Sequence, residues 1–151
     1  MNRLTRATML AGALTLLGAC NSGGDKPQSD AAAPAAQPAA TPGAPITPAP
    51  GNKVITVQME TQEDGSNVFE PNSIEAKRGD VIRYTLVTGV HNADFLPDSN
   101  PGKSGLPPVS ALLQLPGQTY DVKVDLPPGT YYFHCDPHFL LGMKGRLTVV
   151  P

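Results

Sequence analysis

The sequence predicts an all-β domain over residues 53–151, built as a sandwich or a barrel. Three observations predict this fold class. Short runs in this region alternate between apolar and polar residues, as half-buried strands do. Turn-forming groups of Gly, Pro and Asp separate these runs. The 17 Pro and 15 Gly of the 151-residue chain also exceed the share that a helical protein usually carries.

Alternation predicts five strands, which cover residues 53–59, 81–87, 119–125, 130–135 and 145–150. The side chains expected to point into the core are Ile55, Val57, Met59, Ile82, Tyr84, Leu86, Tyr120, Val122, Val124, Tyr131, Phe133, Cys135, Leu147 and Val149. Residues 94–118 are rich in Pro and Gly, so we expect a long loop there, with a single helical turn over residues 109–113.

Two zones precede the domain. Residues 1–20 have a positive start, an uncharged apolar run from Ala7 to Leu17, and a final Leu-Gly-Ala-Cys that resembles the lipobox of bacterial lipoproteins. This resemblance implies export to the periplasm or cell surface, with a membrane anchor on lipidated Cys20; an ordinary cleavable signal is the alternative. Residues 21–52 are rich in Ala and Pro and lack aromatic residues, which predicts a disordered tether.

Composition excludes several classes of protein. The formal net charge of −2 and the lack of a basic cluster argue against a nucleic-acid partner. The only two cysteines lie far apart, each in a motif of its own, so a disulfide framework is not expected. No apolar run reaches 18 residues, which excludes a conventional membrane-spanning helix.

One loop near the C-terminus concentrates residues that bind soft metals. Cys135, His138 and Met143 lie between the last two predicted strands, and His91 lies upstream at a predicted strand end. A thiolate, two imidazoles and a thioether suit copper in both of its oxidation states, and Cys-His-His with a weak axial Met is the blue-copper arrangement. Each residue alone is more often an ordinary core or surface residue, but the joint spacing favours a metal site.

Residues 53–151 resemble the cupredoxins, and the plastocyanin-like members most closely. The motifs that carry the resemblance are the aromatic strand into Cys-Asp-Pro-His over residues 131–138, Gly142-Met143, Leu-Leu-x-x-Pro-Gly-x-Thr-Tyr over residues 112–120, His91-Asn92 with Phe95, and Phe69-Glu-Pro71 with Ile74. Azurins place four residues between Cys and His, and amicyanins two between His and Met, so the spacing differs from both. The resemblance implies a Greek-key sandwich or barrel of about seven or eight strands, early strands around Phe69 and Ile74, and one type 1 copper ion in a monomer.

The resemblance also implies a role for each site residue. His91, Cys135 and His138 are the expected strong ligands and Met143 the weak axial ligand. Asn92 is expected either to bridge the two ligand loops through its amide or to be a turn residue.

Two roles stay open for each of three neighbours of the expected ligands. Pro137 lacks a backbone N–H, which removes a possible donor to the thiolate or stiffens the turn. Asp136 replaces the usual Ser or Thr and brings a carboxylate near the metal, where it either favours oxidised copper or is solvated. His134 points away from the metal by strand alternation and is expected at the surface; an electron-exit or pH-sensitive docking role is the alternative.

The expected function is one-electron transfer through an exposed edge of His138. An apolar docking patch of Phe139, Leu140 and Leu141 is expected around it, together with Leu106 and Pro107. A cytochrome or a membrane redox complex is the expected partner. A copper carrier or buffer without redox duty and a metal-free scaffold module are the alternatives. An enzyme using Cys135 and His138 as nucleophile and base is least supported, since no third orienting group is identified.

Overall fold

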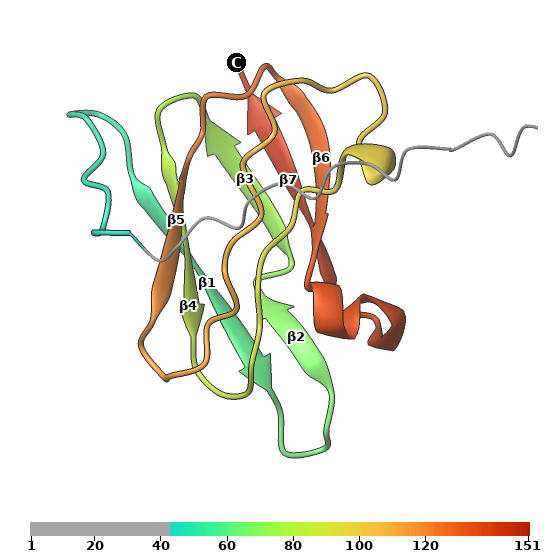
Figure 1. Cartoon of the computed structure of the whole chain (residues 1–151). Helices are drawn as coiled ribbons and strands as arrows, with labels where there is room; N and C mark the ends of the chain where they lie inside the picture. The colour runs from blue at the N-terminus through green and yellow to red at the C-terminus, as the bar shows by residue number, and fades with distance from the viewer. Residues whose placement is uncertain (1–42) are drawn as a thin grey trace, which may run out of the picture. The chain divides into compact units, whose positions relative to one another are not determined.

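The structure, a computed structural model, describes residues 43–151. The predicted signal, Cys20 and most of the predicted tether lie outside the described residues. The described part of the chain has seven strands and two short 3₁₀ helices, and Figure 1 shows how they are arranged. In chain order they are β1 (Val54–Thr61), β2 (Asn67–Glu70), β3 (Ser73–Lys77), β4 (Val81–Leu86), η1 (Pro97–Ser99), β5 (Thr119–Lys123), β6 (Gly129–His134), η2 (Asp136–Leu141) and β7 (Lys144–Val150).

The strands form two mixed sheets. One has the order β2-β1-β4-β5 and the other the order β3-β7-β6. The β1–β4 and β3–β7 pairs are parallel, and the remaining pairs are antiparallel. The predicted fold class, an all-β sandwich, is therefore confirmed.

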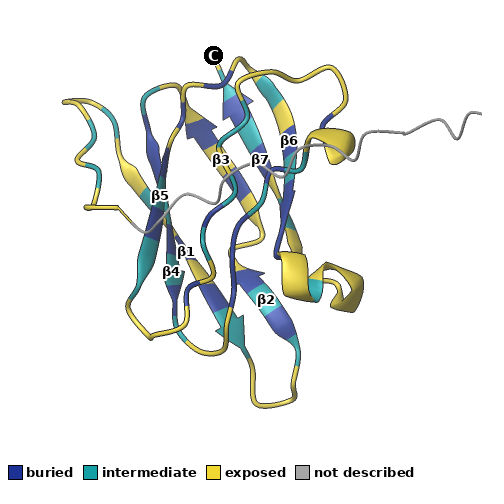
Figure 2. Ribbon diagram, in the orientation of Figure 1, coloured by how far each residue is buried: buried dark blue, intermediate teal, exposed yellow. Residues whose placement is uncertain are grey.

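The core lies between the sheets, and Figure 2 shows buried residues along the strands while η2 is largely exposed. Of the side chains predicted to point inward, all are buried except Ile55, which is partly buried and packs against the core. Phe133 is the centre of an aromatic cluster: its ring centroid lies 5.0 Å from that of Phe69 and 5.4 Å from those of Tyr84 and Phe95. Edge-to-face and tilted contacts of this kind stabilise beyond area burial alone.

The predicted helical turn over residues 109–113 is wrong. This segment is extended, because its backbone pairs with the segment that carries His91. The N–H of Ser110 donates to Ala93 O at 3.0 Å, and Leu113 exchanges two hydrogen bonds with His91, of 2.8 and 3.2 Å. This pairing satisfies backbone groups that a single helical turn would leave open, and it fixes the position of His91.

Residues 46–52, assigned above to the tether, contact the folded domain. The N–H of Ile46 donates to Asp121 Oδ2 at 2.6 Å, and Arg83 donates to the carbonyl of Ile46 at 3.3 Å. Arg83 also holds Asp121 through two hydrogen bonds, of 2.8 and 2.7 Å. The chain therefore joins the domain at the β4–β5 face, ahead of the predicted boundary. Within residues 43–151, no helix has the length and apolar character that a membrane span requires.

Candidate metal centre

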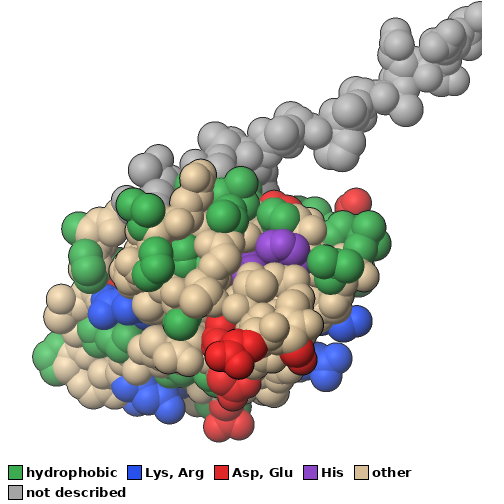
Figure 3. Space-filling model, turned by 90° about the horizontal axis from the view of Figure 1, so that it is seen from below, with side chains coloured by type: hydrophobic (Ala, Val, Ile, Leu, Met, Phe, Trp, Pro, Cys, Tyr) green, Lys and Arg blue, Asp and Glu red, His purple; other side chains and the backbone are tan. Residues whose placement is uncertain are grey.

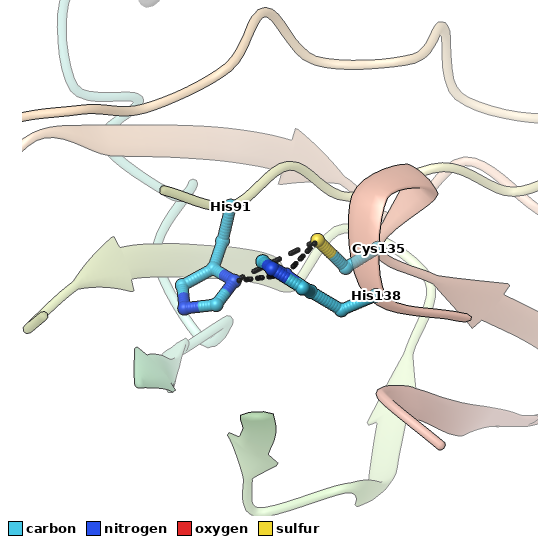
Figure 4. A group of neighbouring side chains, drawn as sticks. All are labelled: His91, Cys135 and His138. Carbon is cyan, nitrogen blue, oxygen red and sulfur yellow. Dashed lines mark hydrogen bonds between the residues drawn. The ribbon is translucent and has the colours of Figure 1, made fainter. Parts of the chain in front are cut away.

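Three potential ligand side chains from two distant segments meet at one end of the sandwich. His91 follows β4, Cys135 follows β6, and His138 lies in η2. Cys135 Sγ lies 3.7 Å from His91 Nδ1 and 3.5 Å from His138 Nδ1, and the two Nδ1 atoms are 3.1 Å apart. Figure 4 shows both rings turned toward the sulfur. The arrangement presents one sulfur and two nitrogen donors to a common point.

The local sequence explains why the ligand loop folds back on itself. Pro137 lies in the first turn of η2, where its missing N–H costs nothing. Gly142 ends the helix with a φ of 95°, a left-handed conformation that glycine adopts without strain. The return brings Met143 beside Cys135, whose N–H donates to Met143 O at 3.2 Å. Met143 is fully buried, with Cys135 in the same core cluster.

Burial controls the ionisation of two of these groups. Burial raises the pKa of the Cys135 thiol, while the backbone N–H groups of Asn92 and His138 act in the opposite direction. Burial, followed by the charge of His138, lowers the pKa of His91 to about 4. His91 is therefore a neutral imidazole at pH 7, the form that offers a lone pair to a metal.

The donor set fits a copper ion. A thiol and two imidazoles within 4.8 Å of one another are soft donors, which select copper over the hard cations that prefer oxygen. Cys135 and His91 are fully buried, so the sulfur is inaccessible to a substrate. This burial removes the basis for Cys135 as an enzymatic nucleophile.

Asn92 connects the two ligand segments. Its Nδ2 donates to Asp136 Oδ2 at 2.6 Å, and its Oδ1 accepts the N–H of Asp136 at 2.8 Å. Since Asn92 follows His91 and Asp136 follows Cys135, this pair of hydrogen bonds ties both ligand backbones together. Hydrogen bonds of this kind hold metal ligands in place before the metal binds.

The prediction that His134 lies at the surface is wrong. Its side chain does point away from Cys135, but only 4% of the residue is exposed. Its Nε2 lies 3.0 Å from Asp136 Oδ1 and 3.9 Å from Asp94 Oδ2, and its ring stacks on Phe139. Strand alternation identified the face correctly, but it could not show that η2 and the Asp94 segment cover that face. Asp136, although half exposed, is held between His134 and Asn92.

The carboxyl of Asp94 is expected to make the stability of the fold depend on pH. Burial, followed by the charge of Asp136, raises the pKa of the Asp94 carboxyl to about 6. Its ionisation therefore opposes folding at neutral pH, and this cost disappears as the pH falls through 6 toward 4. We expect Asp94→Asn to increase the free energy of unfolding of the metal-free protein at pH 7.5 by about 1–3 kcal/mol.

Urea unfolding at a series of pH values measures this difference. The gain from Asp94→Asn should shrink below pH 6 and vanish near pH 4. Asp98→Asn is the matched control, because Asp98 is exposed, and it should change little at any pH. A gain that is independent of pH, or a loss at pH 7.5, would contradict the assignment.

The structure adds residues that the sequence analysis missed. Thr61 lies beside His91, with its Oγ1 3.1 Å from His91 Nε2, and Asn67 lies beside Thr61. Exposed Val90 and Leu112 are chain neighbours of His91 and of its backbone partner Leu113. No local sequence signal marks these residues, because the contacts join segments far apart in the chain. Leu106 and Pro107, expected near His138, instead line a cavity of about 420 Å³ beside β5 that Ile46 also borders.

Comparison with known proteins identifies the family. A family model described as copper binding proteins, plastocyanin/azurin family, matches residues 55–150. The chain belongs to this family. The predicted resemblance to the cupredoxins is thus confirmed, while the lipoprotein signal stays a prediction.

Individual plastocyanins agree with the family assignment. The plastocyanin of Vicia faba is 42% identical over an alignment of 91 positions, and the match covers 57% of this chain and 91% of the relative. The chloroplastic plastocyanin of Pisum sativum is 40% identical, and the match covers 57% of this chain and 54% of that protein. The solved structure of a mutant fern plastocyanin has a TM-score of 0.52 and 35% identity, and the match covers 64% of this chain and all of that one. An amicyanin structure with 23% identity and a TM-score of 0.53 shows likeness of fold alone.

Membership of this family establishes the general function of the chain and its cofactor. Plastocyanin-like proteins bind one type 1 copper ion and transfer electrons to redox partners; they are not enzymes. The chain is therefore a copper-binding electron carrier, and its donor set of His91, Cys135, His138 and Met143 matches that cofactor.

Proposed function

We propose that this chain carries single electrons between redox partners outside the cytosol, while a lipid on Cys20 holds it at a membrane. A cytochrome or a membrane redox complex is the proposed partner. One observation carries the electron-transfer part: His138 is partly exposed and lies among exposed apolar side chains, whereas His91 and Cys135 are buried.

The proposed ligands prepare a site that changes little during electron transfer. A copper ion held there supplies a reversible one-electron couple. His91, Cys135 and His138 lie within 4.8 Å of one another, and Asn92 ties the segments that carry His91 and Cys135 together. Full burial of Cys135 and Met143 excludes water from the sulfur side of the site. A pre-arranged, dry site reduces the rearrangement that accompanies a change of charge.

The exposed face around His138 supports a docking role. Phe139, Leu140 and Leu141 are 45%, 84% and 70% exposed. Figure 3 shows a histidine side chain at the surface with hydrophobic side chains beside it. Among the described residues His138 is the partly exposed histidine, whereas His91 and His134 are buried. An exposed apolar patch marks an interaction site, and redox encounters use small interfaces.

Replacing Leu140 with Asp tests the docking patch. The variant should transfer electrons to or from a c-type cytochrome about tenfold more slowly, equivalent to about 1.4 kcal/mol, because docking would desolvate the new charge. Its visible spectrum should be unchanged, since Leu140 is 84% exposed. Stopped-flow mixing measures the rate.

Val54→Asp is the matched control for this experiment. It introduces the same charge at an exposed apolar residue. Val54 is the first residue of β1, whereas Thr61, the last residue of β1, is the one that contacts His91. The control should keep the wild-type rate. Equal rates for wild type and Leu140→Asp would remove the proposed docking role.

The membrane part of the proposal rests on the sequence of residues 1–20. The lipobox-like ending at Cys20 supports lipidation, and several acyl chains together anchor a protein stably. In a bacterial host, Cys20→Ala should move the protein from the membrane fraction to the soluble fraction without altering its copper spectrum. A variant that stays with the membrane fraction to the same extent as wild type would refute lipid anchoring at Cys20.

A further inference from the structure

We propose that Thr61 is a positioning residue for the copper site, whose hydroxyl fixes the tautomer and orientation of the His91 ring. This proposal rests on His91 as a copper ligand. Thr61 is a hydrogen-bond partner of the ring nitrogen that faces away from the copper site. Thr61 is the last residue of β1, and His91 lies 30 residues further along the chain. The sheet, rather than the ligand loop, supplies this contact.

The two nitrogens of His91 face different partners. Nδ1 lies 3.7 Å from Cys135 Sγ and 3.1 Å from His138 Nδ1, so this nitrogen faces the site. Nε2 lies 3.1 Å from Thr61 Oγ1. A neutral imidazole carries one proton, so a ring that offers its Nδ1 lone pair to a metal must donate from Nε2. Thr61 is placed to accept that donation.

The proton of the Thr61 hydroxyl is already committed elsewhere. The hydroxyl donates to Asn67 Oδ1 at 2.7 Å. Asn67 is the residue directly opposite Thr61 in the β1–β2 pair. Asn67 Nδ2 donates to Gly65 O at 3.4 Å, which orients the amide so that its oxygen faces Thr61. The hydroxyl therefore presents a lone pair to His91. The hydrogen bonds run in one direction, from His91 through Thr61 to Asn67.

The backbone around this contact leaves room for it. Gly89 has a φ of 86°, and a Cβ built there would overlap the Thr61 hydroxyl and approach His91 Nε2 to 2.7 Å. Only glycine fits this position without displacing the pair. Thr88 ties the same loop to β1, because its hydroxyl donates to Thr61 O at 2.8 Å. The loop that carries His91 is thus held against the end of β1 at several points.

Accepting a hydrogen bond from the outer nitrogen of a ligating imidazole raises the basicity of the ligand and fixes its ring. Greater basicity favours the more positive, oxidised metal. Thr61→Val removes the side-chain acceptor and keeps the shape of the side chain, while the backbone carbonyl of Thr88 stays within hydrogen-bonding reach of the His91 ring. We therefore expect weaker copper(II) binding, by about 10- to 100-fold, and a higher reduction potential.

The experiment compares three variants of the full chain with wild type. Copper(II) affinity is measured by competition with a chelator, and the reduction potential by voltammetry. Thr61→Ser keeps the hydroxyl and should restore both values. Thr56→Val makes the same substitution at an exposed position earlier on β1 and should leave both unchanged. Wild-type affinity and potential in Thr61→Val would overturn the proposal, and so would a Ser variant that behaves like Val.

Nuclear magnetic resonance of the wild-type copper(I) protein gives a readout that needs no variant. The Nε2 proton of His91 should be observable and slow to exchange, since Thr61 holds it in a buried site. An Nδ1-protonated ring, or an Nε2 proton that exchanges as fast as one exposed to water, would also overturn the proposal. Wild-type protein that binds no copper would instead defeat the proposed function itself, so the two failures are distinguishable.

Discussion

Replacing Cys135 with Ser is expected to abolish the intense visible absorption of the copper(II)-loaded protein. Cys135 supplies the only sulfur that can ionise to a thiolate among residues 43–151, and it lies within 3.7 Å of both imidazole nitrogens. A serine hydroxyl is a hard, protonated oxygen at pH 7, so it cannot supply the soft thiolate that a type 1 site requires. Visible absorption and paramagnetic resonance of the loaded protein measure the loss.

The fold should survive this substitution, because Ser is close to Cys in size. Burying its hydroxyl costs about 1–3 kcal/mol, which is less than the usual stability of a domain. The matched control is Cys20→Ser, which changes the only other cysteine of the chain and should keep the colour. A Cys135→Ser protein that is as blue as wild type would show that another group binds the copper.

Phe133→Ala is expected to cost about 3–5 kcal/mol of unfolding free energy, a large part of the stability of a small domain. Phe133 is fully buried and contacts Phe69, Tyr84 and Phe95. It also precedes Cys135 by two residues on the inward face of β6. Truncation leaves a cavity under the copper site that these rings cannot fill without losing their own contacts. Urea unfolding of the metal-free protein measures the cost.

Phe139→Ala is the matched control for this loss. It makes the same substitution in η2, where the ring is 45% exposed, and should cost less than about 1 kcal/mol. Copper(II) should recover part of the stability of Phe133→Ala, because a ligand of the native state shifts the folding equilibrium by mass action. Equal costs for the two variants would contradict the position of Phe133 at the centre of the core.

The strands that carry most of the core could be predicted because each has one buried face. Alternation located β1, β4, β5, β6 and β7 to within two residues at each end. It did not locate β2 and β3, which have only four and five residues and show too few alternations for a period to stand out. Their place was expected only from the resemblance around Phe69 and Ile74.

The site was predictable where ligand spacing along the chain carries the chemistry, and not where contacts cross between strands. Cys135, His138 and Met143 lie in one loop, so their spacing alone indicated a metal centre. The burial of His134 beneath η2 depends on how segments pack in three dimensions, and so does the contact of Thr61 with His91. The same applies to Ser110, whose backbone pairs with Ala93 instead of forming a helical turn.

X-ray absorption at the copper edge tests the central claim most directly, when it is recorded on the full chain in both oxidation states. The account predicts one short sulfur neighbour and two imidazole nitrogen neighbours in each state, with little change between them, because the Asn92–Asp136 hydrogen bonds tie together the segments that carry His91 and Cys135. A copper ion surrounded only by oxygen and nitrogen, or one that loses a ligand on reduction, would contradict the account.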